Sequence, residues 1–294
     1  MTTPRPPVSL LANTDRPAAI ECARQLCAWL DDHNVPLRLE ERLAGRLGDG
    51  RRAVPEAELG DAGLLAALGG DGTILAASRV AAARETPILA VHVGGPGSVG
   101  FMAEWEPDQA LAGLQCALRG DCRAEERMRV GATVWRDDAV VARHSALNDL
   151  VVSMPALARM LRLRVSVETT EIAAYAADGV IVATPTGSTA YSLAAGGPIV
   201  HPSLRALLLT PICPHTLSAR TLIVEADQTL SVIIEGPTRA GPVLTVDGQL
   251  GEPLRAGDRI EFRRAPEVTR FLVLDGSSFY QKVRTRMRLG EGLA

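Results

Sequence analysis

Hydrophobic positions in the first third of the chain recur at two different spacings. Short apolar runs of strand length alternate with stretches in which Ala, Ile, Leu and Trp return at helical spacing. The expected strands are residues 8–12, 35–39, 64–68 and 87–93, and the expected helices are residues 17–30, 73–84 and 107–118. This alternation of strand and helix predicts a parallel sheet covered by helices.

The pattern changes after about residue 121. Short β-branched runs follow one another, and turn residues rather than long helices separate them. The expected strands are residues 128–135, 147–153, 161–168, 179–183, 222–225, 230–235, 243–246 and 259–263, followed by a strand over 271–274 and a helix over 277–287. We therefore predict an α/β domain over residues 1–121, an all-β domain over residues 122–268, and a C-terminal segment, 269–294, that packs back on the first domain.

Composition excludes several classes of protein. The 294 residues are 47% hydrophobic and 22% charged, with a formal net charge of −3, which is ordinary for a folded protein and shows no bias towards nucleic acid. No apolar run approaches the roughly 18 residues that span a bilayer, and the first residues lack the apolar core of a signal peptide. We expect a cytoplasmic protein that binds neither nucleic acid nor a membrane.

The cysteines, the histidines and the single lysine exclude further kinds of site. Five scattered cysteines without a C-x-x-C pair favour reduced thiols over a disulfide framework, and neither they nor the five histidines show metal-ligand spacing. The only lysine, Lys282, lies outside any G-x-x-x-x-G-K-[ST] motif, which excludes a P-loop nucleotide site.

A glycine-rich turn, Gly69-Gly70-Asp71-Gly72-Thr73, joins one predicted strand to the next helix. Glycines let the backbone approach a ligand closely, and amides at the start of a helix favour bound phosphate. A carboxylate beside phosphate points to a group that orients a hydroxyl nucleophile and accepts its proton. The alternative is a plain turn in which Asp71 or Thr73 caps the helix.

A second candidate segment runs from Asp178 to Ser192. Its strand leads into Thr-Pro-Thr-Gly-Ser-Thr at residues 184–189, and four hydroxyls with the Tyr191 ring within eight residues suit a sugar, a phosphate or a nucleobase. The alternative is a capped turn with Tyr191 in the core.

Three shorter motifs carry weaker signals. Asn148-Asp149 could bind ribose hydroxyls, although most such pairs are turns, and Asp247-Gly248-Gln249 is first of all typical of a hairpin turn. Residues 95–100 match G-x-G-x-x-G, but no helix follows directly, so we expect no dinucleotide fingerprint there.

Taken together, these segments resemble the NAD kinase family. The resemblance rests on residues 68–73, 147–149, 178–201, 214–220 and 247–249, and the threonine-rich run is its most specific part. It implies an α/β domain and a β domain with the site between them, and Mg²⁺ or another divalent cation as cofactor. It further implies phosphoryl transfer from ATP or polyphosphate to the adenosine-ribose 2′-hydroxyl of NAD, giving NADP, by a homodimer or homotetramer.

The resemblance also implies roles for individual residues. Asp71 matches the family's catalytic aspartate, and the glycine-rich turn supplies a phosphate loop of Gly69, Gly70, Gly72 and Thr73. The implied NAD contacts are Asp71, Gly72, Phe101, Asn148, Asp149, Arg159, Asp178, Thr186, Thr189, Ala190, Tyr191, Ser192, Leu193, Ala194 and Gln249. No protein ligand for the metal is predicted.

Three positions depart from the family's pattern. Asp149 stands where Glu is usual, residues 92–101 form a longer loop without the usual Asn, and Ala176 replaces a basic residue that some members carry. Two rivals share part of the pattern: a diacylglycerol-type lipid kinase and a non-catalytic NAD(P)-binding regulator. The choices of ATP or polyphosphate, and of NAD or NADH, stay open.

Overall fold

The chain divides into two compact units. The computed structural model describes residues 6–94, 100–154, 160–236, 241–274, 276 and 278–288. The first unit comprises Met1–Glu126 and Glu267–Ala294, and the second comprises Arg127–Pro266. The chain therefore enters the second unit once and returns to the first, and each unit has a hydrophobic core of its own.

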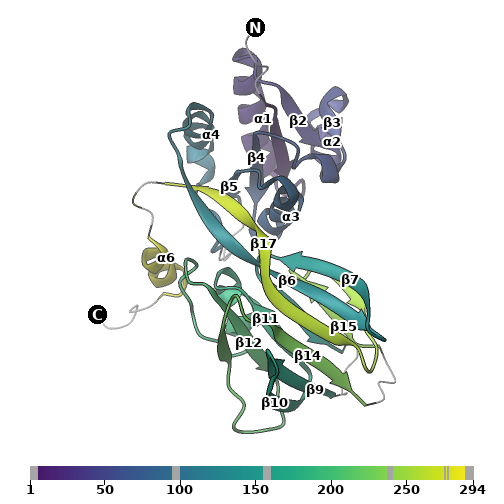
Figure 1. The fold of residues 1–294 in the computed structure, drawn as a ribbon. Coiled ribbons are helices and arrows are strands. Elements are labelled where there is room, and N and C mark those ends of the chain that lie inside the picture. The colour runs from purple at the N-terminus through teal and green to yellow at the C-terminus, as the bar shows by residue number, and fades with distance from the viewer. Residues whose placement is uncertain are drawn as a thin grey trace, which may run out of the picture. The chain divides into compact units, whose positions relative to one another are not determined.

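The first unit is a parallel sheet with helices (Figure 1). Its strands, in spatial order, are β3 (Ala53–Val54), β2 (Leu37–Glu40), β1 (Val8–Ala12), β4 (Leu64–Gly69), β5 (Ile88–His92) and the end of β17 (Arg259–Val273). Its helices are α1 (Pro17–Asp32), α2 (Glu41–Leu47), α3 (Asp71–Ala81), α4 (Ala110–Arg119) and α6 (Phe279–Arg286). All neighbouring strands are parallel, as the alternating pattern predicts. No helix among the described residues is long and apolar enough to cross a membrane.

Helix α1 illustrates how the sequence builds this unit. Pro17 occupies its first turn, where the missing N–H costs nothing. Its buried side chains recur at helical spacing and face the sheet: Ala19, Cys22, Ala23, Leu26 and Leu30.

The second unit is built from antiparallel strands. One sheet has the order β10 (Thr170–Ala177), β9 (Leu161–Val167), β14 (Leu230–Glu235) and β17, with β6 (Arg123–Arg136) paired to β17 and β7 (Ala139–Ala146) paired to β6. The other has the order β13 (Leu222–Glu225), β12 (Ala206–Ile212), β11 (Gly179–Ala183), β8 (Asp149–Ser153), β15 (Val243–Val246) and β16 (Leu250–Pro253). Side chains of both sheets form one core, and the short helix α5 (Tyr191–Ala194) follows β11.

Several strands differ from the sequence prediction. The pattern does not predict β3, β7, β10, β12 or β16, and it splits β17 into two strands at residues 259–263 and 271–274. Proline explains two of these differences, because it cannot donate to a ladder and is rare inside a sheet. Pro266 nevertheless lies within β17, and Pro211 lies within β12 between β11 and β13.

The cysteines also differ in part from the prediction. Cys116 in α4 and Cys122 form a disulfide with a Cα–Cα distance of 5.4 Å, so the expectation of reduced thiols is wrong for this pair. Gly120, with a φ of 76° at the end of α4, turns the chain back and brings the two together. Cys22 and Cys27 are free thiols, and burial raises the pKa of each to about 11.

Candidate functional site

The glycine-rich turn lies at the carboxyl end of the parallel sheet of the first unit, the edge at which such sheets bind ligands. Gly69 ends β4, Gly70 is extended, and Asp71 is the first residue of α3. No side chain caps this helix, so the alternative in which Asp71 or Thr73 serves as a cap is wrong. A Cβ on Gly69 would lie 2.3 Å from the hydroxyl oxygen of Thr73, and therefore only glycine permits this turn.

Two backbone amides hold the carboxylate of Asp71. Phe101 N–H donates to one oxygen over 3.2 Å and Met102 N–H to the other over 3.5 Å. Burial raises the pKa of Asp71 above its ordinary value, while the two amides and the charges of His92 and Arg286 act against that rise. The carboxylate is thus oriented and more basic than one in water.

His92 is a neighbour of this carboxylate that the sequence analysis did not single out. It ends β5 in register with Gly69 on β4, and its Nδ1 is buried without a hydrogen-bond partner among the described residues. A Cβ on Gly100 would lie 2.8 Å from that nitrogen and 3.3 Å from Asp71. A polar residue at the carboxyl end of a neighbouring parallel strand was the signal that could have found it. Of the loop over residues 92–101, residues 95–99 lie outside the described part of the chain.

In the second unit, Asn148 and Asp149 lie where β7 gives way to β8, against the threonine-rich loop. Thr184 N–H donates to the carbonyl of Asn148 over 2.8 Å, and its hydroxyl donates to the carbonyl of Leu147 over 2.6 Å. A Cβ on Gly187 would lie 2.1 Å from the Asn148 carbonyl oxygen. Glycine is therefore required for the loop to pack this closely on the pair.

Two polar atoms in this region point to a ligand. Asn148 Oδ1 and Thr186 Oγ1 are buried and have no hydrogen-bond partner among the described residues. Since buried polar atoms in proteins are normally paired, these two need a partner that a bound molecule can supply. Burial, together with the charge of Asp247, raises the pKa of the neighbouring Asp149 to about 7.

The predicted run from Thr189 to Ala194 has one buried residue, Ser192, and two exposed ones, Tyr191 and Ala194, while the other three are intermediate. Tyr191 is 47% exposed, so the alternative that placed its ring in the core is wrong. Ser192, by contrast, is buried and its hydroxyl shares a hydrogen bond with that of Thr210 over 2.9 Å. The run thus presents Tyr191 outward on an anchored turn.

The remaining predicted contacts are more widely spread. Asp178 is exposed and precedes β11, whereas the threonine-rich loop follows that strand. Five strand residues separate the two by about 17 Å. Gln249 is exposed and follows the Asp247 turn, and Arg159 lies outside the described residues.

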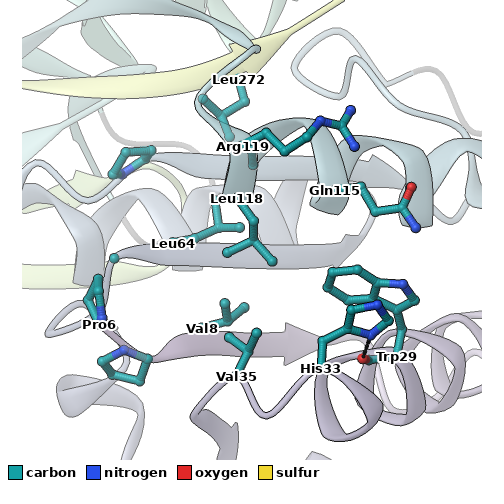
Figure 2. Close-up of a pocket in the computed structure, with 14 residues that line it drawn as sticks. Pro6, Val8, Trp29, His33, Val35, Leu64, Gln115, Leu118, Arg119 and Leu272 are labelled. Atoms are coloured by element: carbon teal, nitrogen blue, oxygen red, sulfur yellow. Dashed lines mark hydrogen bonds between the residues drawn. The ribbon is translucent and has the colours of Figure 1, made fainter. Parts of the chain in front are cut away.

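A cavity of about 660 Å³ lies elsewhere in the first unit. Val8, Leu64 and Pro87 place it at the amino ends of the strands, the opposite edge from the glycine-rich turn. Figure 2 shows the rings of Trp29 and His33 stacked at one side of it, with centroids 3.8 Å apart. The residues that line this cavity include no carboxylate or hydroxyl side chain, and the cavity lies at the edge of the sheet opposite Asp71.

Both parts of the chain match known families. Residues 8–122 match the model of the ATP-NAD kinase N-terminal domain, and residues 147–274 match that of the ATP-NAD kinase C-terminal domain. The chain is 43% identical to the NAD kinase of Moorella thermoacetica over 96% of this chain and 89% of that protein. It is 38% identical to the NAD kinase of Geobacter sp. (strain M21) over 97% of this chain and 99% of that protein.

Solved structures share the fold. A yeast NADH kinase complexed with NADH is similar with a TM-score of 0.88 and 23% identity, over 99% of this chain and 89% of that one. An NAD kinase from Archaeoglobus fulgidus in complex with ATP is similar with a TM-score of 0.75 and 24% identity, over 96% and 98%. The predicted combination of an α/β domain and a β domain is confirmed, as is the resemblance found in the sequence. The chain belongs to the NAD kinase family.

Proposed function

We propose that this chain phosphorylates NAD on the 2′-hydroxyl of its adenosine ribose, with ATP or polyphosphate as the donor and with Asp71 as the base. As a member of the NAD kinase family it is a kinase that transfers a phosphoryl group to an alcohol. One observation carries the assignment of the base. At the start of α3, the amides of Phe101 and Met102 orient a carboxylate that burial has made more basic.

In this mechanism the Asp71 carboxylate accepts a hydrogen bond from the 2′-hydroxyl and takes its proton as the ribose oxygen attacks the terminal phosphorus. The new oxygen–phosphorus bond forms as the bond to the bridging oxygen breaks. ADP, or the shortened polyphosphate, leaves with the electron pair. The amides of the glycine-rich turn bind the phosphate oxygens of the donor, aided by the positive end of α3.

The second unit is proposed to hold the nucleoside. Asn148 and Asp149 hold adenine and ribose, and the unpaired Oδ1 of Asn148 and Oγ1 of Thr186 support that role. The further proposed contacts are Gly72, Phe101, Arg159, Asp178, Thr189, Ala190, Tyr191, Ser192, Leu193, Ala194 and Gln249. In the proposed division into domains, residues 1–121 carry the phosphate loop, residues 122–268 bind NAD, and residues 269–294 pack back on the first domain.

A divalent cation, Mg²⁺ in the first instance, is proposed to accompany the donor. Among the described residues, no three His, Cys, Asp or Glu side chains gather into a metal site. Mg²⁺ typically keeps several waters and binds largely through substrate phosphates, and Asp71 is reserved here for the role of base. When bound, it neutralises charge on the phosphoryl group. A homodimer or homotetramer in the cytoplasm is also proposed, and light scattering on the purified protein would establish its mass.

The test is an NADP-formation assay on wild type and Asp71→Asn, read with an NADP-specific dehydrogenase. General-base catalysis contributes about 10²- to 10⁴-fold, so we expect kcat to fall by that factor while the Kd for NAD changes little. An unchanged kcat would remove Asp71 from the chemistry. NAD binding without NADP formation from either donor would favour a non-catalytic regulator.

A further inference from the structure

One carboxylate outside the proposed NAD contacts organises the segment that carries Asn148 and Asp149. Asp247 lies in the turn between β15 and β16. One of its oxygens accepts the N–H of Leu147 over 2.9 Å, and the other accepts those of Asn148 over 2.7 Å and Asp149 over 3.2 Å. In return, Asp247 N–H donates to the carbonyl of Asp149 over 3.0 Å.

The turn itself does not need this carboxylate. Asp247 has a φ of 48° and Gly248 a φ of 66°, and Asn occupies such left-handed turn positions as readily as Asp. Instead, both carboxylate oxygens accept hydrogen bonds from the three backbone amides of residues 147–149, at the start of β8. Hydrogen bonds to an ionised acceptor are roughly twice as strong as neutral ones, so the effect of the charge falls on residues 147–149.

A buried arginine supports this arrangement. Arg129 on β6 is 1% exposed and donates to the hydroxyl of Ser145 over 2.8 Å and to its carbonyl over 3.1 Å. Burial raises the pKa of Asp247, while the three amides and the charge of Arg129 act in the opposite direction. The surroundings therefore provide compensation for a negative charge at this position.

We propose that Asp247 is a positioning residue for nucleotide binding, which gathers the three amides and so sets the direction in which Asn148 and Asp149 meet NAD. The inference rests on the proposed function, in which that pair holds the adenosine. Among the described residues, the hydrogen bonds of the Asp247 side chain go to the backbone amides of residues 147–149. Its effect on NAD therefore passes through Asn148 and Asp149.

The charge of Asp247 close to Asp149 also predicts a pH dependence of NAD binding. A residue with a purely structural role would not change that pH dependence. Burial and the charge of Asp247 raise the pKa of Asp149 to about 7. Among the described residues, Asp247 is the charged group that acts on Asp149, and Arg129 acts in turn on Asp247. An ionised Asp149 accepts hydrogen bonds from ribose hydroxyls better than a protonated one. NAD affinity should therefore rise as the pH increases through about 7 and level off above it.

Four variants separate charge from geometry. Asp247→Asn keeps the turn and one acceptor but removes the charge, and Asp247→Glu keeps the charge but displaces the carboxylate by one methylene. Asp149→Asn removes the titrating group. Asp137→Asn is the matched control, because Asp137 lies in an exposed turn with a φ of 49°. Each is titrated with NAD alone by calorimetry from about pH 5.5 to about pH 8.5, and KM and kcat are measured in parallel.

In Asp247→Asn, loss of hydrogen bonds to a charged group should raise the Kd and KM for NAD by about tenfold near pH 8. We expect kcat to stay within about threefold of wild type and the pH step to move to lower pH. Asp247→Glu should weaken binding without moving the step, Asp149→Asn should abolish the step, and Asp137→Asn should match wild type.

Wild-type affinity in both Asp247 variants would overturn the inference, as would a pH step that stays in place in Asp247→Asn. If Asp247→Asn does not fold, Asp247→Glu and Asp149→Asn still decide, because wild-type affinity in the first or a persisting step in the second contradicts it. Failure of the wild-type protein to bind NAD would count against the proposed function instead.

Discussion

The carboxylate of Asp71 must be ionised to accept a proton, yet burial raises its pKa. We therefore expect kcat to fall as the pH is lowered through that raised pKa, because the protonated acid cannot act as a base. Saturating NAD keeps the titration of Asp149 in the binding step out of the measurement. A kcat that stays level down to about pH 4, the ordinary range of an aspartate, would contradict the assignment.

Gly187 is a residue of the proposed site at which backbone packing leaves no room for a side chain. A Cβ there would lie 2.1 Å from the carbonyl oxygen of Asn148 and 2.5 Å from its carbon. Both are backbone atoms, so neither segment can move aside without a large cost in free energy. We expect Gly187→Ala to lower the free energy of unfolding by about 1–3 kcal/mol and to weaken NAD binding more than tenfold. Calorimetric titration and denaturant unfolding measure the two effects.

The matched control is Gly45→Ala. Gly45 lies exposed within α2, and a Cβ there would meet nothing within 4 Å. Alanine should stabilise that helix by about 0.5–1 kcal/mol and leave NAD binding unchanged. Equal behaviour of the two variants would show that the close approach at Gly187 has no effect on the site.

Local sequence reveals some of these residues and not others. Asp71 is recognisable because it lies within a motif of five consecutive residues, 69–73, at the start of a predicted helix. Asp247 is not, because Asp-Gly in a hairpin satisfies turn chemistry by itself. The amides that donate to the Asp247 carboxylate, those of residues 147–149, lie 98 to 100 residues away in the chain. The amides that hold Asp71 come from 30 or 31 residues away and were equally invisible.

At the scale of elements, the parallel half of the fold was the easier to predict. Most of its strands are short apolar runs between amphipathic helices, so two periods alternate along the chain, although α2 and β3 were not predicted. The antiparallel half has a single period. There, β12 was not predicted although it is largely buried. Pro211 disfavours an inner strand in the local sequence, and only pairing with the neighbouring strands outweighs that preference.

Helix α6 gives the only lysine of the chain a structural role. Lys282 forms an ion pair with Glu104, whose side chain is 4% exposed, and its ammonium lies 3.4 Å from the carbonyl of Ala103. These residues directly follow the amides of Phe101 and Met102 that hold Asp71. Helix α6 therefore anchors the segment that orients the proposed base.

Lys282→Met should remove the ion-pair partner of the buried Glu104 carboxylate. We expect a loss of about 3 kcal/mol in the free energy of unfolding, together with a lower kcat as the segment shifts. The double variant with Glu104→Gln should recover part of both, because it leaves no buried charge. Arg119→Met is the control: its pair with Asp121 is 61% exposed on both sides and should contribute less than about 0.5 kcal/mol. Wild-type stability of Lys282→Met would refute this role.

The whole molecule divides its chemistry between its two units. The first carries the glycine-rich turn and Asp71, and the second carries Asn148, Asp149 and the threonine-rich loop. Their order along the chain made the family recognisable, because each motif needs only its own neighbours in sequence. The supporting contacts of Asp247 and Lys282 required the folded units, because each joins segments far apart in the chain.

The charge of the whole molecule predicts that the proposed reaction requires a divalent metal ion. A polyphosphate donor brings several negative charges to a protein whose formal net charge is already −3. Its one lysine is committed to Glu104. Amides and arginines remain, and a divalent cation would add two concentrated positive charges beside the donor phosphates. Exhaustive chelation with EDTA should therefore abolish NADP formation, and added Mg²⁺ should restore it, while NAD binding measured without donor stays unchanged.

EDTA already saturated with Mg²⁺ is the control for effects of the chelator itself. A full rate in metal-free buffer would mean that side chains and amides of this chain neutralise the donor unaided, and the metal would then have to be removed from the mechanism.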